Sequence, residues 1–210
     1  MTRCTAFNGA KRIASGDLKE VALKAKAILD RTKYAQVLIF DDATSELIEV
    51  DFRGTPASML HRIAEPAAQS NEPNRIEPNQ EERGPGRPKL GVVAREVTLL
   101  PRHWDWLATQ PGGASVALRK LVEQARHANQ GRDRLRRAQE AAYRFLSAMA
   151  GNEPGFEEAI RALFAHKPKH FDEIVEPWPR DVRDHARKLA AIAFAEAPAV
   201  STKNGSAKNS

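Results

Sequence analysis

The clearest chemistry in the sequence belongs to a short stretch in which cations alternate with glycine and proline, Arg83-Gly84-Pro85-Gly86-Arg87-Pro88-Lys89. Arginine and lysine neutralise phosphates, which releases condensed counterions and drives binding to nucleic acid. The tripeptide Gly86-Arg87-Pro88 is narrow and extended, so it fits a minor groove, and the negative potential of A·T tracts attracts its arginine. We therefore predict that this stretch contacts DNA, preferring A·T-rich duplex, through Arg83, Gly86, Arg87, Pro88 and Lys89.

The elements that would position these cations follow directly along the chain. Residues 92–100 are rich in β-branched and apolar side chains and predict a strand, which ends at Pro101. A helix over residues 101–110 and a break at Gly112-Gly113 come next. Ser115 suits the N-cap of a second helix, whose apolar face consists of Val116, Leu118, Leu121, Val122 and Ala125.

The order of strand, helix, glycine turn and serine-capped helix resembles that of ribbon-helix-helix DNA-binding proteins. The resemblance implies that two chains pair one strand each and insert the two-stranded ribbon into the major groove. It places Arg95 and Thr98 on the ribbon and the helix N-terminus at Ser115 against phosphate. The preceding Gly86-Arg87-Pro88-Lys89 resembles an AT-hook, which implies minor-groove contacts beside the ribbon.

A helix-turn-helix is the alternative arrangement of the same segment. In that case the second helix, over residues 114–126, would be the recognition helix, and Arg119 and Lys120 would contact DNA instead of the ribbon. The sequence leaves both arrangements open.

The charge distribution supports a nucleic-acid partner for this central region. The chain of 210 residues carries a formal net charge of +6, and residues 83–150 hold 13 of its Lys and Arg but only 5 Asp and Glu. No apolar run approaches the 18 residues of a membrane helix, and the start lacks the apolar region of a secretory signal. A single cysteine, Cys4, suits a reducing compartment. We expect a cytoplasmic protein without a membrane partner.

No pattern in the chain indicates catalysis. Walker, G-x-S-x-G, H-E-x-x-H and C-x-x-C motifs are absent from the sequence. Asp41 and Asp42 are neighbours on one strand, so their side chains point to opposite faces and do not form a catalytic pair. His166 and His170 lack the further ligands of a zinc site. We predict that the protein is not an enzyme and has no metal, no cofactor and no evident small-molecule ligand.

The fold class expected from the remaining pattern is α+β. Residues 1–65 predict a small antiparallel ββαββα unit, with a turn at Asn8-Gly9 and a helix capped by Asp17. Within it, residues 36–40 and 47–52 predict a pair of strands, and Lys26 is expected on the outer helix face.

Four further regions complete the expected domain organisation. Residues 66–86 predict a flexible linker and residues 87–129 the ribbon-helix-helix-like segment. Residues 130–196 predict a helical domain, with Asn129-Gln130-Gly131 breaking or kinking the helix before it, and residues 197–210 a disordered tail.

Four stretches carry a resemblance of nearly the whole chain to an uncharacterised bacterial family, a domain of unknown function. They are residues 4–7, 37–44, 86–115 and 178–190. The resemblance implies a bacterial cytoplasmic protein and supplies no activity. From the residues themselves we expect a homodimeric DNA-binding transcriptional regulator. The alternative is a protein-interaction, adaptor or antitoxin-like module, whose central strand pairs with another chain and which has no nucleic-acid role.

Overall fold

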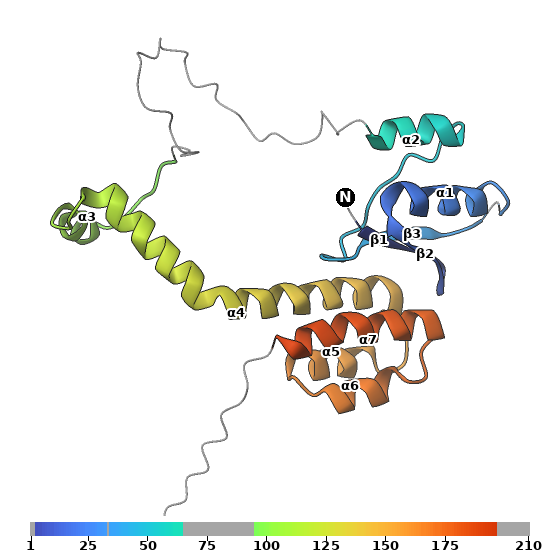
Figure 1. Cartoon of the computed structure of the whole chain (residues 1–210). Coiled ribbons are helices and arrows are strands. Elements are labelled where there is room, and N and C mark those ends of the chain that lie inside the picture. The colour runs from blue at the N-terminus through green and yellow to red at the C-terminus, as the bar shows by residue number, and fades with distance from the viewer. Residues whose placement is uncertain (1–2, 33, 65–94, 197–210) are drawn as a thin grey trace, which may run out of the picture. The chain divides into compact units, whose positions relative to one another are not determined.

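A computed structural model of the chain describes residues 3–32, 34–64 and 95–196 (Figure 1). Their contacts divide these residues into two compact units. The first combines the described residues up to 64 with residues 128–196, and the second comprises residues 95–127. The expected α+β class is confirmed, since the described residues form a three-stranded antiparallel sheet near the N-terminus and seven helices. None of the described helices is both long and apolar enough to cross a membrane.

The sheet of the first unit grows from a hairpin of β1 (Arg3–Asn8) and β2 (Lys11–Asp17). The predicted Asn-Gly turn is present, with Gly9 in the left-handed region at φ 54° that glycine adopts without strain. Strand β3 (Val37–Asp41) pairs antiparallel with the other edge of β1, so the strand order is β2-β1-β3.

The predicted returning strand over residues 47–52 is wrong. A single bridge joins Leu47 to Phe40, and no strand follows it. The physical reason lies in side chains that take the backbone carbonyls which a strand would need. Arg62 donates to the carbonyls of Asp51 and Arg53, and Lys26 donates to that of Phe52. The unit is therefore ββαβα rather than ββαββα.

Helix α1 (Leu18–Leu29) begins as the sequence predicts, because the Asp17 carboxylate accepts a hydrogen bond from the Lys19 N–H. The expectation that Lys26 lies on the outer face is wrong. Its side chain is buried, and its ammonium group lies 3.0 Å from an Asp30 carboxylate oxygen and 3.0 Å from the Phe52 carbonyl oxygen. These two acceptors compensate the ammonium group for its loss of water.

The region over residues 130–196 is helical, as the sequence predicts. Helix α4 (Gly113–Ala150) runs unbroken through Gly131, so the glycine there does not end it. The remaining helices include two that carry proline at their start. They are α2 (Pro56–Ala64), α5 (Phe156–Phe164), α6 (Pro168–Val175) and α7 (Arg180–Ala195).

The sheet lies between α1 on one face and the C-terminal helices α4 and α7 on the other (Figure 1). On the first face, Cys4 and Ala6 pack with residues of α1. On the second, Phe7 and Phe40 pack in one cluster with Phe145 of α4 and with residues of α5, α6 and α7. The sequence suggested separate domains over residues 1–65 and 130–196, whereas the structure gives these regions one shared core.

A histidine takes part in this core. His185 of α7 is 3% exposed, and its ring centroid lies 4.5 Å from that of Phe145 and 5.5 Å from that of Phe7. The pKa of His185 is lowered to about 4, mainly by burial and also by the charges of Lys188 and Arg12, while Asp42 opposes the shift. The imidazole is thus neutral where the N-terminal sheet meets the C-terminal helices.

We expect the first unit to lose about 3 kcal/mol of stability as the pH falls from about 6.5 to about 4, because the pKa of His185 is lower in the folded than in the unfolded chain. The contribution is fully present above the unfolded pKa and disappears as protons bind the unfolded state first. Urea unfolding across this range measures it. The His185→Gln variant is the control, since it should remove this part of the pH dependence, and an identical dependence in both proteins would contradict the assignment.

Candidate nucleic-acid interface

The second unit contains a short helix, a glycine turn and the first part of a long helix. Helix α3 (Pro101–Ala108) has Pro101 in its first turn, as predicted. The chain then turns at Gly112, whose φ of 83° favours glycine and where an added Cβ would lie only 3.1 Å from the Val116 side chain. Helix α4 starts at Gly113. The predicted helix, turn and helix are therefore present, with the second helix beginning at Gly113, ahead of the N-cap that the sequence suggested at Ser115.

The predicted DNA-contacting residues divide into two groups. Arg83, Gly86, Arg87, Pro88 and Lys89 lie outside the described residues. Arg95 and Thr98 are exposed in the segment 95–100, which forms no strand within the single chain. A lone strand has no ladder to join until a second copy supplies one.

Ser115 lies in the first turn of α4 rather than at its N-cap, and its hydroxyl accepts a hydrogen bond of 2.9 Å from Arg119. Both side chains are exposed. This contact joins the residue expected to bind phosphate in the ribbon arrangement to a residue expected to bind DNA in the helix-turn-helix arrangement. The α4 start thus combines backbone N–H groups with a guanidinium group, and both attract anions.

Large apolar side chains are exposed over the whole second unit. Only Leu107 and Ala117 are buried among its described residues. Of the thirteen exposed large hydrophobic residues in the described chain, seven lie here, and Trp104 and Trp106 are 42% and 51% exposed. The others are Val97, Leu100, Val116, Leu121 and Val122. An apolar surface of this kind is typical of an interaction site.

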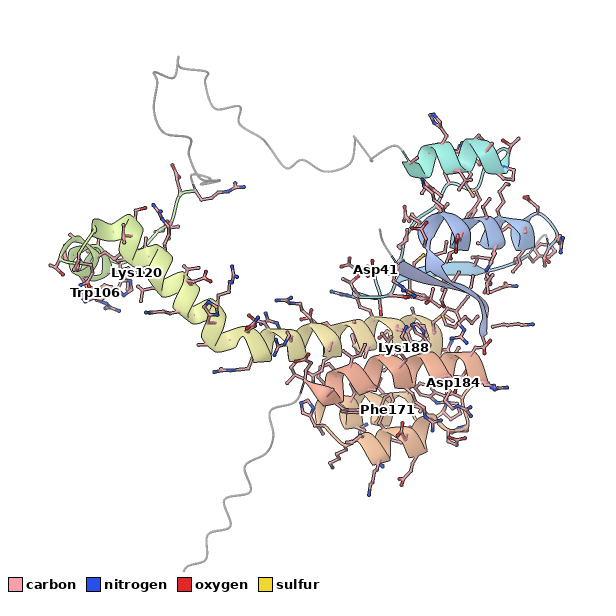
Figure 2. The ribbon with its side chains drawn as sticks, in the orientation of Figure 1. Asp41, Trp106, Lys120, Phe171, Asp184 and Lys188 are labelled. Atoms are coloured by element: carbon pink, nitrogen blue, oxygen red, sulfur yellow. The ribbon has the colours of Figure 1, made fainter. Side chains whose placement is uncertain are left out.

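Trp106 is the residue that the sequence analysis missed. It lies in the wall of a hollow of about 190 Å³ to which Lys120 and Leu121 also contribute, and Figure 2 labels Trp106 and Lys120. The available signal was the helical period: Trp104, Leu107 and Ala108 are spaced as one apolar stripe, and Trp106 lies outside that stripe. An exposed tryptophan beside a lysine offers both contact area and charge.

Some cations of the second unit pair with a carboxylate and others do not. Arg126 and His127 lie 3.7 Å and 3.1 Å from the Glu123 carboxylate. Within the described part of the chain, Arg102 and Lys120 make no ion pair. Arg102 and Lys120 are exposed and have no neighbouring carboxylate, so they can bind an anionic partner without first breaking an ion pair.

Outside this unit, the candidate chemical groups are held in structural roles. The Asp41 carboxylate accepts from the Ala43 and Thr44 N–H groups, while Asp42 accepts from the Thr5 hydroxyl at 2.6 Å. The two carboxylates thus serve different partners, although Asp42 lies in the turn after β3 and not on the strand as the sequence analysis assumed. Burial raises the pKa of the Cys4 thiol to about 11, which disfavours its nucleophilic thiolate. In the described ranges, no three His, Cys, Asp or Glu residues gather as metal ligands would.

Comparison with known proteins assigns the chain to a family. Residues 3–190 match the family described as an uncharacterized protein conserved in bacteria, DUF2239, and the chain belongs to it. No curated protein and no solved structure matches the chain. The family assignment agrees with the resemblance noted in the sequence and carries no activity with it.

Proposed function

We propose that this protein is a DNA-binding transcriptional regulator that acts as a homodimer through its central region. In this proposal, Arg83, Arg87 and Lys89 enter the minor groove and the segment 92–100 pairs with its copy as a ribbon. The exposed α4 start contacts the phosphate backbone, as helix N-termini do.

The observation that carries the proposal is the incomplete core of the second unit. Helix α3 and the part of α4 up to residue 127 bury only Leu107 and Ala117, which is too little apolar contact to stabilise this unit by itself. A second copy would supply the missing contacts, because a two-fold axis sets the same apolar patch against itself. The exposed Val97 and Leu100 precede α3 directly, so strand pairing and helix packing would bury one continuous surface.

Electrostatics favour DNA as the ligand of such a dimer. Pairing doubles every cation, and residues 83–150 already carry 13 Lys and Arg against 5 Asp and Glu in one chain. The described cations of the second unit, among them Arg95, Arg102 and Lys120, are exposed. A dimer would present them as a basic surface, which concentrates a polyanion and accelerates its binding.

Salt-dependent binding of the full chain to A·T-rich duplex tests the proposal. If about four to six phosphate or groove contacts are made, the logarithm of the affinity should fall with the logarithm of salt concentration at a slope of roughly −4 to −5. The Arg87→Ala variant should weaken binding about tenfold and reduce the magnitude of this slope by about 2, since the dimer loses two cations. Fluorescence anisotropy over a salt series measures both quantities.

Two variants control this experiment. Arg161→Ala removes an exposed cation of the first unit, which pairs with Glu158 at 2.8 Å, and should leave affinity and slope unchanged. Arg119→Ala separates the two arrangements. If Arg119→Ala is defective while Arg87→Ala binds like the wild type, the contact lies on the α4 helix and the ribbon arrangement is wrong. No duplex binding by the wild type at about 50 mM salt and micromolar protein would contradict DNA binding altogether.

The exposed tryptophans favour one alternative function, a protein-interaction or adaptor module. Trp104 and Trp106 are of the residue type that dominates the energetics of protein interfaces. An adaptor would hold its partner through apolar contacts, so its binding would change little with salt. The salt slope described above therefore separates the two functions.

A further inference from the structure

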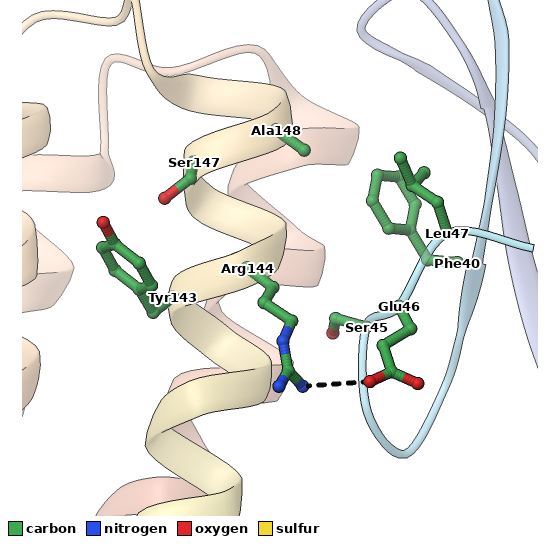
Figure 3. Close-up of a pocket in the computed structure, with 8 residues that line it drawn as sticks. All are labelled: Phe40, Ser45, Glu46, Leu47, Tyr143, Arg144, Ser147 and Ala148. Atoms are coloured by element: carbon green, nitrogen blue, oxygen red, sulfur yellow. Dashed lines mark ion pairs between the residues drawn. The ribbon is translucent and has the colours of Figure 1, made fainter. Parts of the chain in front are cut away.

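We infer that the first unit carries a binding site for a small aromatic carboxylate, in the groove between α4 and the loop that follows β3. This inference is independent of the proposed DNA binding. The groove encloses about 520 Å³, which lies within the range of small-molecule sites. Its apolar lining comes from Phe40, Leu47, Tyr143 and Ala148, and its polar groups are Ser45, Glu46, Arg144 and Ser147. Figure 3 shows α4 facing the loop across this groove.

The loop side of the groove is preorganised. The Asp41 carboxylate fixes the turn by accepting from the Ala43 and Thr44 N–H groups, and the Ser45 N–H donates to the Asp41 carbonyl. Ser45 has a φ of 53°, a left-handed conformation that is unfavourable for serine. A turn held this way presents Glu46 and Leu47 at a fixed position opposite α4.

Arg144 determines the chemistry of the ligand. Its Nη1 donates to the Thr44 carbonyl at 3.0 Å, which anchors the guanidinium group at the groove. It also forms ion pairs with Glu46 and Glu140, each at 3.9 Å, beyond hydrogen-bonding distance; both carboxylates are about half or more exposed, so a ligand carboxylate can displace them at little cost. Several guanidinium donors therefore have no hydrogen-bond acceptor among the described residues. A carboxylate is the group that accepts from two such donors at once.

The rim and wall of the groove indicate the other properties of the ligand, an aromatic ring and a further polar atom. Leu47 and Tyr143 are 54% and 45% exposed, so an aromatic ring placed between them would cover apolar surface that water now contacts. The buried Ser45 hydroxyl, in a residue only 3% exposed, makes no hydrogen bond to any described residue. Its oxygen has almost no contact with solvent, so a polar ligand atom satisfies it once the serine side chain rotates toward the groove.

Calorimetric titration of the full chain with 2-naphthoate and with its neutral isostere 2-naphthamide tests the site. We expect the wild type to bind naphthoate at least tenfold more tightly than naphthamide. Arg144→Gln should weaken naphthoate binding at least tenfold and abolish the preference for naphthoate over naphthamide. Arg144→Lys should retain only part of this preference, because lysine keeps the charge but lacks the planar guanidinium group. The matched control Arg161→Gln removes an exposed guanidinium of the same unit and should change neither affinity.

Ser45→Ala distinguishes a ligand-binding hydroxyl from a merely structural one. The variant should weaken naphthoate binding several-fold, while the ligand-free protein keeps or raises its unfolding midpoint, because an unsatisfied buried hydroxyl is removed. An unchanged naphthoate affinity in Ser45→Ala would overturn the role of this hydroxyl. Equal binding of naphthoate and naphthamide, no binding of either, or the same loss in Arg161→Gln as in Arg144→Gln would overturn the site.

Discussion

Replacing Val122 by glutamate should convert the proposed dimer to a monomer and lower the proposed affinity for DNA by about two to four orders of magnitude. Val122 is 62% exposed in the single chain, so the carboxylate adds little strain to the protomer itself. In the proposed dimer, the same position meets the partner copy, and an unpaired carboxylate buried there opposes association. DNA affinity falls with it because the two halves no longer bind as one linked unit.

Light scattering at tens of micromolar protein and anisotropy with A·T-rich duplex measure the two effects of this substitution. The control is Ile192→Glu, which adds the same charge at a residue of α7 that is 48% exposed and lies in the other unit. This control should remain dimeric and bind DNA normally. A wild-type chain that is already monomeric at these concentrations would refute the proposed ribbon, as would a dimeric Val122→Glu protein.

The Phe145→Ala variant should destabilise the first unit by about 3–5 kcal/mol, the range for removing a fully buried phenylalanine. The Phe145 side chain is fully buried, and its ring centroid lies 5.5 Å from that of Phe7 and 5.3 Å from that of Phe40. Its removal leaves a cavity where the N-terminal sheet meets α4. Urea unfolding followed by circular dichroism measures the loss.

The matched control is Phe164→Ala, the same change at a residue that is 48% exposed. It should cost less than about half as much, because less apolar area leaves water at that position. Hydrogen exchange adds a second readout, since a shared core requires that amides of β1 and of α7 lose protection together in Phe145→Ala. Loss of protection in α7 alone would show that the two regions fold separately.

Local signals in the sequence determined the start and end of most elements. The Asn8-Gly9 pair predicted the hairpin turn, Asp17 the start of α1, and Pro101 the start of the helix that follows it, and the structure has each of them. Such signals are reliable because a turn, a cap or a proline acts on backbone dihedrals and N–H groups within a few residues.

Signals that depend on distant partners were not available from the sequence. Residues 47–52 alternate as a strand does, yet the carbonyls of Asp51 and Phe52 accept hydrogen bonds from Arg62 and Lys26. The helical period placed Lys26 one turn after Ala22 on the buried face, but its charge suggested solvent, and only the Phe52 carbonyl and Asp30 make its burial favourable. A sequence pattern shows that a segment can form a strand or a buried helix face. Whether it does so depends on the hydrogen-bonding groups and apolar surfaces that other segments place beside it.

The candidate sites also differ in whether adjacent residues or distant contacts define them. The sequence by itself located the cations at Arg83, Arg87 and Lys89 and the helix, turn and helix that follow them, because composition and local breaks are written in adjacent residues. Only the tertiary structure brought Phe7 and Phe40 onto Phe145, and only it set Arg144 opposite Ser45. These residues lie about a hundred positions apart in the sequence, and no periodicity within either segment specifies which distant surface will cover an apolar face.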